Sequence, residues 1–429
     1  MIRNFFDYQK YVFRIKKKDT IVLLTDVFLF VLSVFALMND WSRLTGNLKN
    51  NWSTMLIIIG VILKFSYDVY KMADELKGSF NLKYGKLVPG EFDLNTLKVD
   101  PADNEKYQYE ILKCSIDGIS EECVMNSKII DQHLITNQIR LNVVKSKEKQ
   151  IFEFIRDNST TLLPFLQWQY RYSNLYGKMF FNEQKLCLSK DIDIKGNIAS
   201  CHRGSYYDTY LTNIICGSQL KSNKDDSIIS SVEDYLPIKL RNEEIYIKDI
   251  TSSIMNNEIG ISTLAVTSDN YLVLWTQNRM AQASNGLLVP TGSGSCDWKD
   301  KTSDNFGDVI IGAMKRELWE ESGRKHISKY HSEIGKTIIL GHFKWVNKAG
   351  KPEFVGLTKV NSDLASFVEN KREVYKRVEY HINRIEDIKR LIGEITSGGN
   401  ISVPLYMNLL CLERYYDDHK EKLAEFIGI

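Results

Sequence analysis

Two long apolar runs near the N-terminus constrain this 429-residue chain more than any other feature. The first occupies residues 21–38 and is interrupted by only three polar residues, among them Asp26. The second begins at residue 52, and polar side chains near its end can extend a helix to residue 70 by reaching an interface. Since about 20 apolar residues in a helix span the hydrocarbon core of a bilayer, the sequence predicts transmembrane helices at about residues 20–38 and 52–70.

The basic residues around these runs predict their orientation. Lysine and arginine are concentrated before the first run and after the second, whereas only Arg43 and Lys49 lie between them. By the positive-inside rule both termini are cytoplasmic, which describes a multi-pass protein of the cell inner membrane with a large cytoplasmic C-terminal portion. Two buried core helices are the alternative. Asp26 within the first span indicates a homo-oligomer or a pore, unless it lies at the cytoplasmic interface.

Composition excludes two classes of function for the rest of the chain. The formal net charge is only +2, which argues against a DNA or RNA polymer as partner. The seven cysteines are odd in number and form no CxxC pair, which is typical of neither a disulfide framework nor a zinc site. We therefore expect reduced thiols in a cytosolic setting.

The remaining pattern divides the chain into four parts and predicts an α+β fold. A two-helix transmembrane hairpin fills residues 1–70, and residues 71–99 are a helical, polar connector. Residues 100–250 mix short apolar runs with polar stretches, and we expect a mixed α/β region that serves as a sensor or in oligomerisation. Residues 251–429 form the most regular part.

One short stretch of the middle region has an unusual composition. Between residues 200 and 208 lie His202, Arg203, Tyr206 and Tyr207. These side chains could contact a nucleotide through phosphate pairing and ring stacking. The alternative is a polar turn whose two aromatic rings belong to the core.

The C-terminal part begins with clear strand signals. Residues 261–267 and 271–276 predict a hairpin, and residues 286–290 predict a short strand that leads into the glycine-rich loop 291–295. A helix is expected over residues 308–322. Two further strands and two closing helices are expected at residues 335–346, 352–360, 384–394 and 403–426.

Three carboxylates on the expected helix indicate chemistry. Glu317, Glu320 and Glu321 are spaced i, i+3 and i+4, so they share one helical face and repel one another. Mg²⁺ or Mn²⁺ would compensate these charges and leave positions open for a diphosphate and for water. Arg316 is expected to hold one of the carboxylates from behind.

Residues 316–323 read Arg-Glu-Leu-Trp-Glu-Glu-Ser-Gly, which resembles the core of the Nudix signature. The resemblance covers about residues 255–429 and implies an α/β/α sandwich and a Mg-dependent pyrophosphohydrolase, with Glu317, Glu320 and Glu321 as catalytic metal ligands. The family pattern also has a Gly fourteen residues and a Glu eight residues before the Arg, where this chain has Thr302 and Asp308. The phosphate loop is therefore remodelled, and hydrolysis and binding without turnover both remain open.

Two transmembrane helices in front of a Nudix domain resemble one class of effectors of the bacterial anti-phage systems called CBASS. In that class a cGAS-like nucleotidyltransferase (CD-NTase) makes a cyclic nucleotide second messenger. The effector senses this cyclic oligonucleotide, oligomerises and disrupts the inner membrane, which causes abortive infection. The alternatives are a membrane-tethered Nudix hydrolase of a nucleoside diphosphate derivative and a membrane anchor whose soluble part binds another protein.

Overall fold

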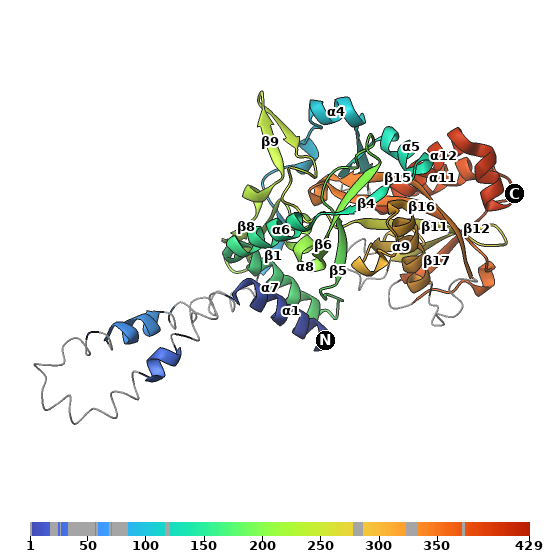
Figure 1. The fold of residues 1–429 in the computed structure, drawn as a ribbon. Coiled ribbons are helices and arrows are strands. Elements are labelled where there is room, and N and C mark those ends of the chain that lie inside the picture. Colours follow the sequence, from blue (N-terminus) through green and yellow to red (C-terminus); the bar gives the residue numbers. More distant parts are fainter. Residues whose placement is uncertain are drawn as a thin grey trace, which may run out of the picture.

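The structure is a computed structural model. It describes residues 2–17, 25, 27–32, 56, 59–67, 70, 85–115, 121–277, 286–322, 333–370 and 374–429. Within these residues the fold is mixed α/β, as predicted, and Figure 1 shows the arrangement of its helices and strands.

A nine-stranded sheet forms the centre of the molecule. Its main order is β13-β12-β11-β16-β15-β3-β2, and β14 and β17 pair with β11 and β12. Only β11 and β16 run parallel, in a register that joins Gly260 to Glu353. The strands are β2 (Glu110–Ser115), β3 (Glu121–Asn126), β11 (Gly260–Val266), β12 (Tyr271–Gln277), β13 (Leu288–Val289), β14 (Gly292–Ser295), β15 (Ile334–Trp345), β16 (Lys351–Val360) and β17 (Val374–His381).

Helices cover both faces of this sheet. Consecutive residues of a strand point to opposite faces. Accordingly Phe354 packs in one core cluster with α9 (Phe306–Glu321), while Val355 packs in another with α11 (Asp387–Ser397) and α12 (Val403–Ile427). The C-terminal part is thus an α/β/α sandwich, as the sequence predicts.

The predicted hairpin, helix 308–322, the two long strands and the two closing helices are all present, with bounds that differ by a few residues. Two elements differ from expectation. The glycine-rich loop 291–295 is mostly strand β14, and β17 was not predicted.

The middle region contains several small sheets and helices. The sheets have the strand orders β4-β6-β5, β1-β7-β8 and β10-β9. The elements are β1 (Gly85–Pro89), α4 (Pro101–Tyr107), α5 (Lys128–Thr136), β4 (Arg140–Val143), α6 (Lys145–Asp157), α7 (Ser159–Leu175), β5 (Gln184–Leu188), β6 (Ile198–Ser205), α8 (Tyr206–Thr209), a π-helix (Tyr210–Ile214), β7 (Ser218–Ser222), β8 (Ile228–Ser231), β9 (Ile238–Arg241) and β10 (Glu244–Ile247). Of the predicted helical connector 71–99, residues 71–84 lie outside the described residues, and the rest is β1 and a single 3-10 turn.

The predicted boundary between residues 250 and 251 does not separate two sheets. Strand β3 pairs with β15, joining Asn126 to Phe343, so two strands of the middle region extend the central sheet. Strand β5 also approaches the sandwich, because the Leu186 N–H donates to the carbonyl of Cys296 (2.9 Å). All seven cysteines are buried free thiols.

Helix α1 (Ile2–Ile15) packs on the middle region, and the segment between α1 and β1 is called the arm below. Tyr8 of α1 stacks on Tyr170 of α7 with ring centroids 4.3 Å apart. At the other end of the arm, the Trp168 indole donates to the carbonyl of Gly85 (2.7 Å). Tyr11 and Leu87 pack in one hydrophobic cluster, so both ends of the arm are attached to the same core.

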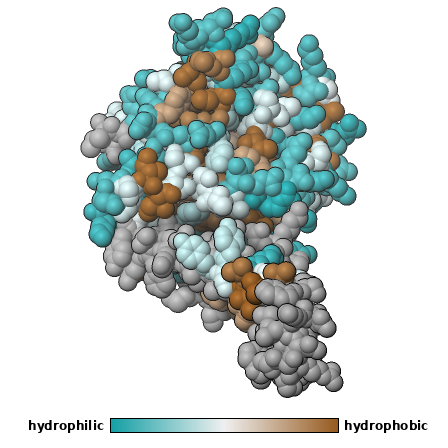
Figure 2. All heavy atoms as spheres, turned by 90° about the vertical axis from the view of Figure 1, so that its left-hand side faces the viewer, coloured by the Kyte–Doolittle hydropathy of each residue, from teal (hydrophilic) through white to brown (hydrophobic). Residues whose placement is uncertain are grey.

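The described parts of the arm are helical and apolar, and they project from the body in Figure 1. Phe30 and Phe65 stack with centroids 4.3 Å apart, so the two apolar runs are in contact. Phe28 and Leu63 are 62% and 65% exposed. In Figure 2 hydrophobic side chains of the arm lie beside the grey residues at the lower end of the view.

None of the helices formed by the described residues is long and apolar enough to cross a bilayer. Of the predicted spans 20–38 and 52–70, the structure describes residues 25, 27–32, 56, 59–67 and 70, so both spans remain predictions.

Candidate functional site

Helix α9 positions the Arg-Glu-Leu-Trp-Glu-Glu motif on its last turns. The helix begins after Asn305, whose side chain accepts a hydrogen bond from the Gly307 N–H (3.0 Å). Val309, Ala313 and their neighbours at helical spacing are completely buried against the sheet. Because one face is fixed in the core, the side chains of the motif have a defined direction.

Arg316 is the centre of an ion-pair network. Its guanidinium makes two hydrogen bonds to Asp300, at 2.8 and 2.7 Å. It also contacts Glu317 (2.8 Å) and Glu320 (3.4 Å). The sequence predicts that Arg316 holds a carboxylate, and it does. Its main partner, however, is Asp300 of the 3-10 turn Trp298–Asp300, whereas Asp308 is exposed on the first turn of α9.

The glycines of β14 allow this strand to lie directly against α9. A Cβ on Gly292 would lie 2.7 Å from the Leu318 Cα, and one on Gly294 would lie 2.4 Å from the carboxyl carbon of Glu317. A side chain at Gly292 would therefore push the strand away from the helix, and one at Gly294 would displace the carboxylate of Glu317. The glycine-rich segment therefore allows strand β14 to pack directly on helix α9.

The three glutamates differ in their surroundings. Burial raises the pKa of Glu317 to about 7, although the neighbouring Arg316 opposes this shift. The Glu320 side chain is 47% exposed, whereas Glu321 is buried.

These carboxylates do not fit a divalent ion in the observed arrangement. Among the described residues, no three His, Cys, Asp or Glu side chains are grouped so as to hold a metal. Mg²⁺ binds oxygen ligands such as carboxylates, and these ligands must surround the ion in a nearly octahedral arrangement. Here Arg316 contacts both Glu317 and Glu320, and the nearby Asp297 is paired with Lys185 (2.6 Å). The helix on which the Mg²⁺ or Mn²⁺ site was predicted is present. The negative charges of its carboxylates, however, are already compensated by positively charged side chains of the protein.

The structure separates the four residues that the sequence groups as nucleotide contacts. His202 is completely buried between Ser189 (2.9 Å) and Asn256 (3.3 Å), and burial lowers its pKa to about 4. Tyr207 is completely buried and Tyr206 partly buried. Both rings pack on Phe180.

Arg203 is the member of this group that reaches the surface. Its side chain is 48% exposed and pairs with Glu148 of α6 (3.2 Å). It lines a small hollow together with Arg14 of α1 and Asp208. A ligand that entered this hollow would contact α1 directly, which is the helix that precedes the arm.

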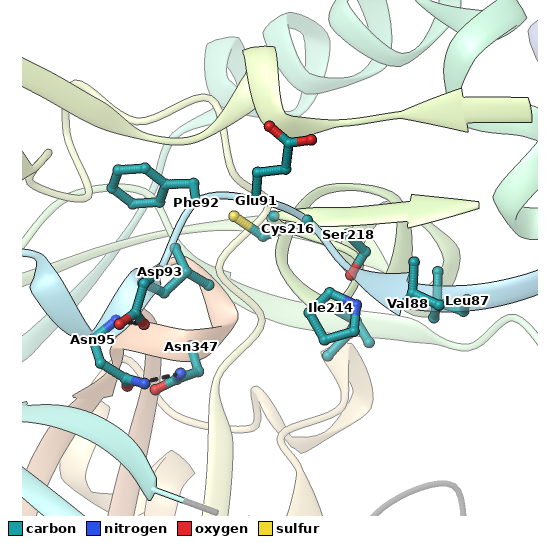
Figure 3. A pocket seen from close by; sticks show the side chains of 14 residues that line it. Leu87, Val88, Glu91, Phe92, Asp93, Asn95, Ile214, Cys216, Ser218 and Asn347 are labelled. Carbon is teal, nitrogen blue, oxygen red and sulfur yellow. Dashed lines mark hydrogen bonds between the residues drawn. The ribbon is translucent and has the colours of Figure 1, made fainter. Parts of the chain in front are cut away.

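A cavity that the sequence analysis did not predict lies at the other end of the arm. It has a volume of about 560 Å³ and is lined by residues 87–95, by the end of the π-helix and by Asn347 (Figure 3). Figure 3 shows Phe92, Asp93 and Asn95 on one side. Neither lysine nor arginine is among the described residues that line it, so the cavity does not favour a phosphate group.

Comparison with solved structures returned Nudix proteins. A protein from Deinococcus radiodurans (DR0079) has 14% identity and a TM-score of 0.26, and the match covers 37% of this chain and 83% of that one. A Nudix hydrolase from Nitrosomonas europaea has 16% identity and a TM-score of 0.25, covering 38% and 89%. A MutT protein from Methanosarcina mazei Go1 has 14% identity and a TM-score of 0.26, covering 38% and 96%.

No protein family and no curated protein matches the sequence. Structural similarity as low as that of the three neighbours does not by itself assign a family. The C-terminal part is an α/β/α sandwich, and its helix α9 carries the Arg-Glu-Leu-Trp-Glu-Glu motif.

Proposed function

We propose that this chain is a membrane effector whose body senses a ligand and whose arm acts on a lipid bilayer. Following its resemblance, the ligand is a cyclic oligonucleotide made by a CD-NTase, and the outcome is disruption of the inner membrane in a CBASS response. The observation that best supports the proposal is the attachment of both ends of the arm to one core, through Tyr11 and Leu87. A ligand that favours one arrangement of this core would act on both ends of the arm together.

The exposed apolar side chains of the arm support the membrane part of the proposal. Phe28, Val31 and Leu63 are each more than half exposed although they lie on neighbouring helical segments. Contiguous exposed apolar surface is typical of sites that bind a membrane or another protein. Oligomerisation and localisation in the inner membrane belong to the same proposal.

Dye release from liposomes tests this function. Full-length protein is incorporated into dye-loaded liposomes and exposed to cyclic di- and trinucleotides. We expect one of them to trigger release. Phe28→Asp should abolish release, whereas Phe6→Asp, which changes an equally exposed phenylalanine of α1, should retain it. Absence of release with every nucleotide, or release by the Phe28 variant, contradicts the proposal.

A membrane-tethered Nudix hydrolase of a nucleoside diphosphate derivative is the second candidate, and the motif on α9 favours it. Formation of a nucleoside monophosphate from a panel of nucleoside diphosphate derivatives with Mg²⁺ separates the two. Turnover that is lost in Glu320→Gln would support the hydrolase, and absence of turnover would support a domain that only binds.

A further inference from the structure

The carboxylates of Asp297, Asp300 and Glu317 lie together beside α9 and are called the acidic centre below. Lys185 of the middle region reaches this centre. Strand β5 runs next to the end of β14, because Leu186 donates to Cys296 and Ile259 donates to Leu186 (2.9 and 3.0 Å). This pairing fixes the neighbouring Lys185 beside Asp297, with the ammonium 2.6 Å from the carboxylate. Both side chains are at least nine-tenths buried.

The charges around Lys185 explain why it stays ionised in the interior. Burial alone would lower its pKa, but Glu258, Asp297 and Glu183 outweigh this and raise the pKa. The Glu183 carboxylate lies 3.6 Å from the ammonium. Glu258 is buried, and one of its carboxylate oxygens has no hydrogen-bond partner among the described residues. Lys185 is therefore a buried positive charge that lies among several carboxylates.

Lys185 and Arg316 act on the same set of carboxylates. Arg316 lies 3.7 Å from Asp297, so the two cations share this carboxylate. The charge of Lys185 also extends to Glu317, whose pKa it lowers against the effect of burial. Two monovalent cations held by the fold supply the same total charge as one Mg²⁺ or Mn²⁺.

We propose that Lys185 is a built-in cation that takes the place of a divalent metal in this Nudix-like centre. The negative charges of the acidic centre are then compensated without a metal ion. The ion pairs of Lys185 and Arg316 with Asp297 also connect β5 of the middle region to α9. This inference concerns the body alone and holds whether or not the arm enters a membrane.

Binding of Mn²⁺ to purified full-length protein, followed by electron paramagnetic resonance, tests this assignment. The wild-type protein should show no Mn²⁺ site tighter than millimolar. Lys185→Met removes the cation and should create a site that binds Mn²⁺ at least about tenfold more tightly. Mn²⁺ should also raise the melting temperature of this variant and not that of the wild type.

Lys299 provides a matched control, because its ammonium also pairs with Asp297 (3.1 Å) but its side chain is 64% exposed. Lys299→Met should therefore leave Mn²⁺ binding as weak as in the wild type. Equal Mn²⁺ affinity of the wild type and the Lys185 variant overturns the proposal. If the Lys185 variant does not fold, the wild type decides: a submillimolar Mn²⁺ site that disappears in Glu317→Gln refutes the proposal, and its absence supports it.

Discussion

One of the contacts that hold helix α1 to the body is a buried hydroxyl, and removing this hydroxyl tests how the arm is anchored. The Tyr11 hydroxyl donates to Asp208 at 2.6 Å, and the Tyr11 side chain is only 4% exposed. Its ring lies edge-on to Tyr207, with centroids 5.3 Å apart. Tyr11→Phe keeps this ring contact and removes only the hydrogen bond.

The expected cost follows from the state of Asp208. Its carboxylate retains the Ser205 hydroxyl (2.7 Å) but loses one of its donors in a buried site. Burial already raises the pKa of Asp208. Loss of a hydrogen bond to a charged acceptor costs about 1.5–3 kcal/mol. We expect α1 to detach locally, with an opening equilibrium about 10–100-fold larger.

Hydrogen exchange of the full-length protein in detergent measures this opening. Amides of α1 should exchange about 10–100-fold faster in Tyr11→Phe, while those of α9 keep their rates. Phe13→Ala is the control, since Phe13 lies on α1 but is 54% exposed, and its rates should match the wild type. Unchanged exchange of α1 in Tyr11→Phe would refute the conclusion that this hydrogen bond holds the helix in place.

Three further predictions concern the body. His202 has its pKa lowered from 6.5 to about 4, so between these pH values only the unfolded chain takes up the proton. Stability that is present above pH 6.5 should therefore fall by about 3 kcal/mol toward pH 4, and His202→Asn should flatten this slope in urea unfolding measured across pH. Gly294→Val places a side chain against Glu317 and should lower the free energy of unfolding by about 1–3 kcal/mol; a variant as stable as the wild type in thermal unfolding would contradict the close approach. Arg316→Lys cannot make the paired hydrogen bonds to Asp300 and should cost about 2–3 kcal/mol in the same measurement, whereas no loss would mean that this network does not stabilise the fold.

Local patterns in the sequence predicted much of the sandwich. The helix with the motif begins two residues earlier than expected, at Phe306, because Asn305 caps it. The hairpin at residues 261–276 and the two closing helices follow from periodicity and turn residues. These elements depend mainly on neighbours in the chain, so a single sequence contains the information.

The contacts that shape the site are long-range and have no local signature. Lys185 reaches Asp297 because β5 pairs beside β14, and nothing near residue 185 indicates this partner. Arg316 pairs with Asp300 because the 3-10 turn Trp298–Asp300 lies against α9. The spacing of a family motif could not have shown either pairing.

The stretch 200–208 shows how composition can be misleading. A strand ends at Ser205, whose side chain caps α8, so His202 and Tyr207 point into the core. The short apolar-polar pattern and the serine cap were available in the sequence. The aromatic and charged residues made a ligand site one of two interpretations, the other being a polar turn whose two rings belong to the core. Both rings pack on Phe180, and Arg203 is the member of the group that is about half exposed.

The pairing of β3 with β15 imposes an order on biosynthesis. Asn126 leaves the ribosome long before its partner Phe343, and at usual elongation rates the roughly 200 intervening residues take about 10–40 s to be translated. During this interval β2 and β3 of the middle region exist without the strand that joins them to the central sheet. The β3 edge that later pairs with β15 is open in the nascent chain, and any output that depends on the complete sheet begins only after β15 has been made.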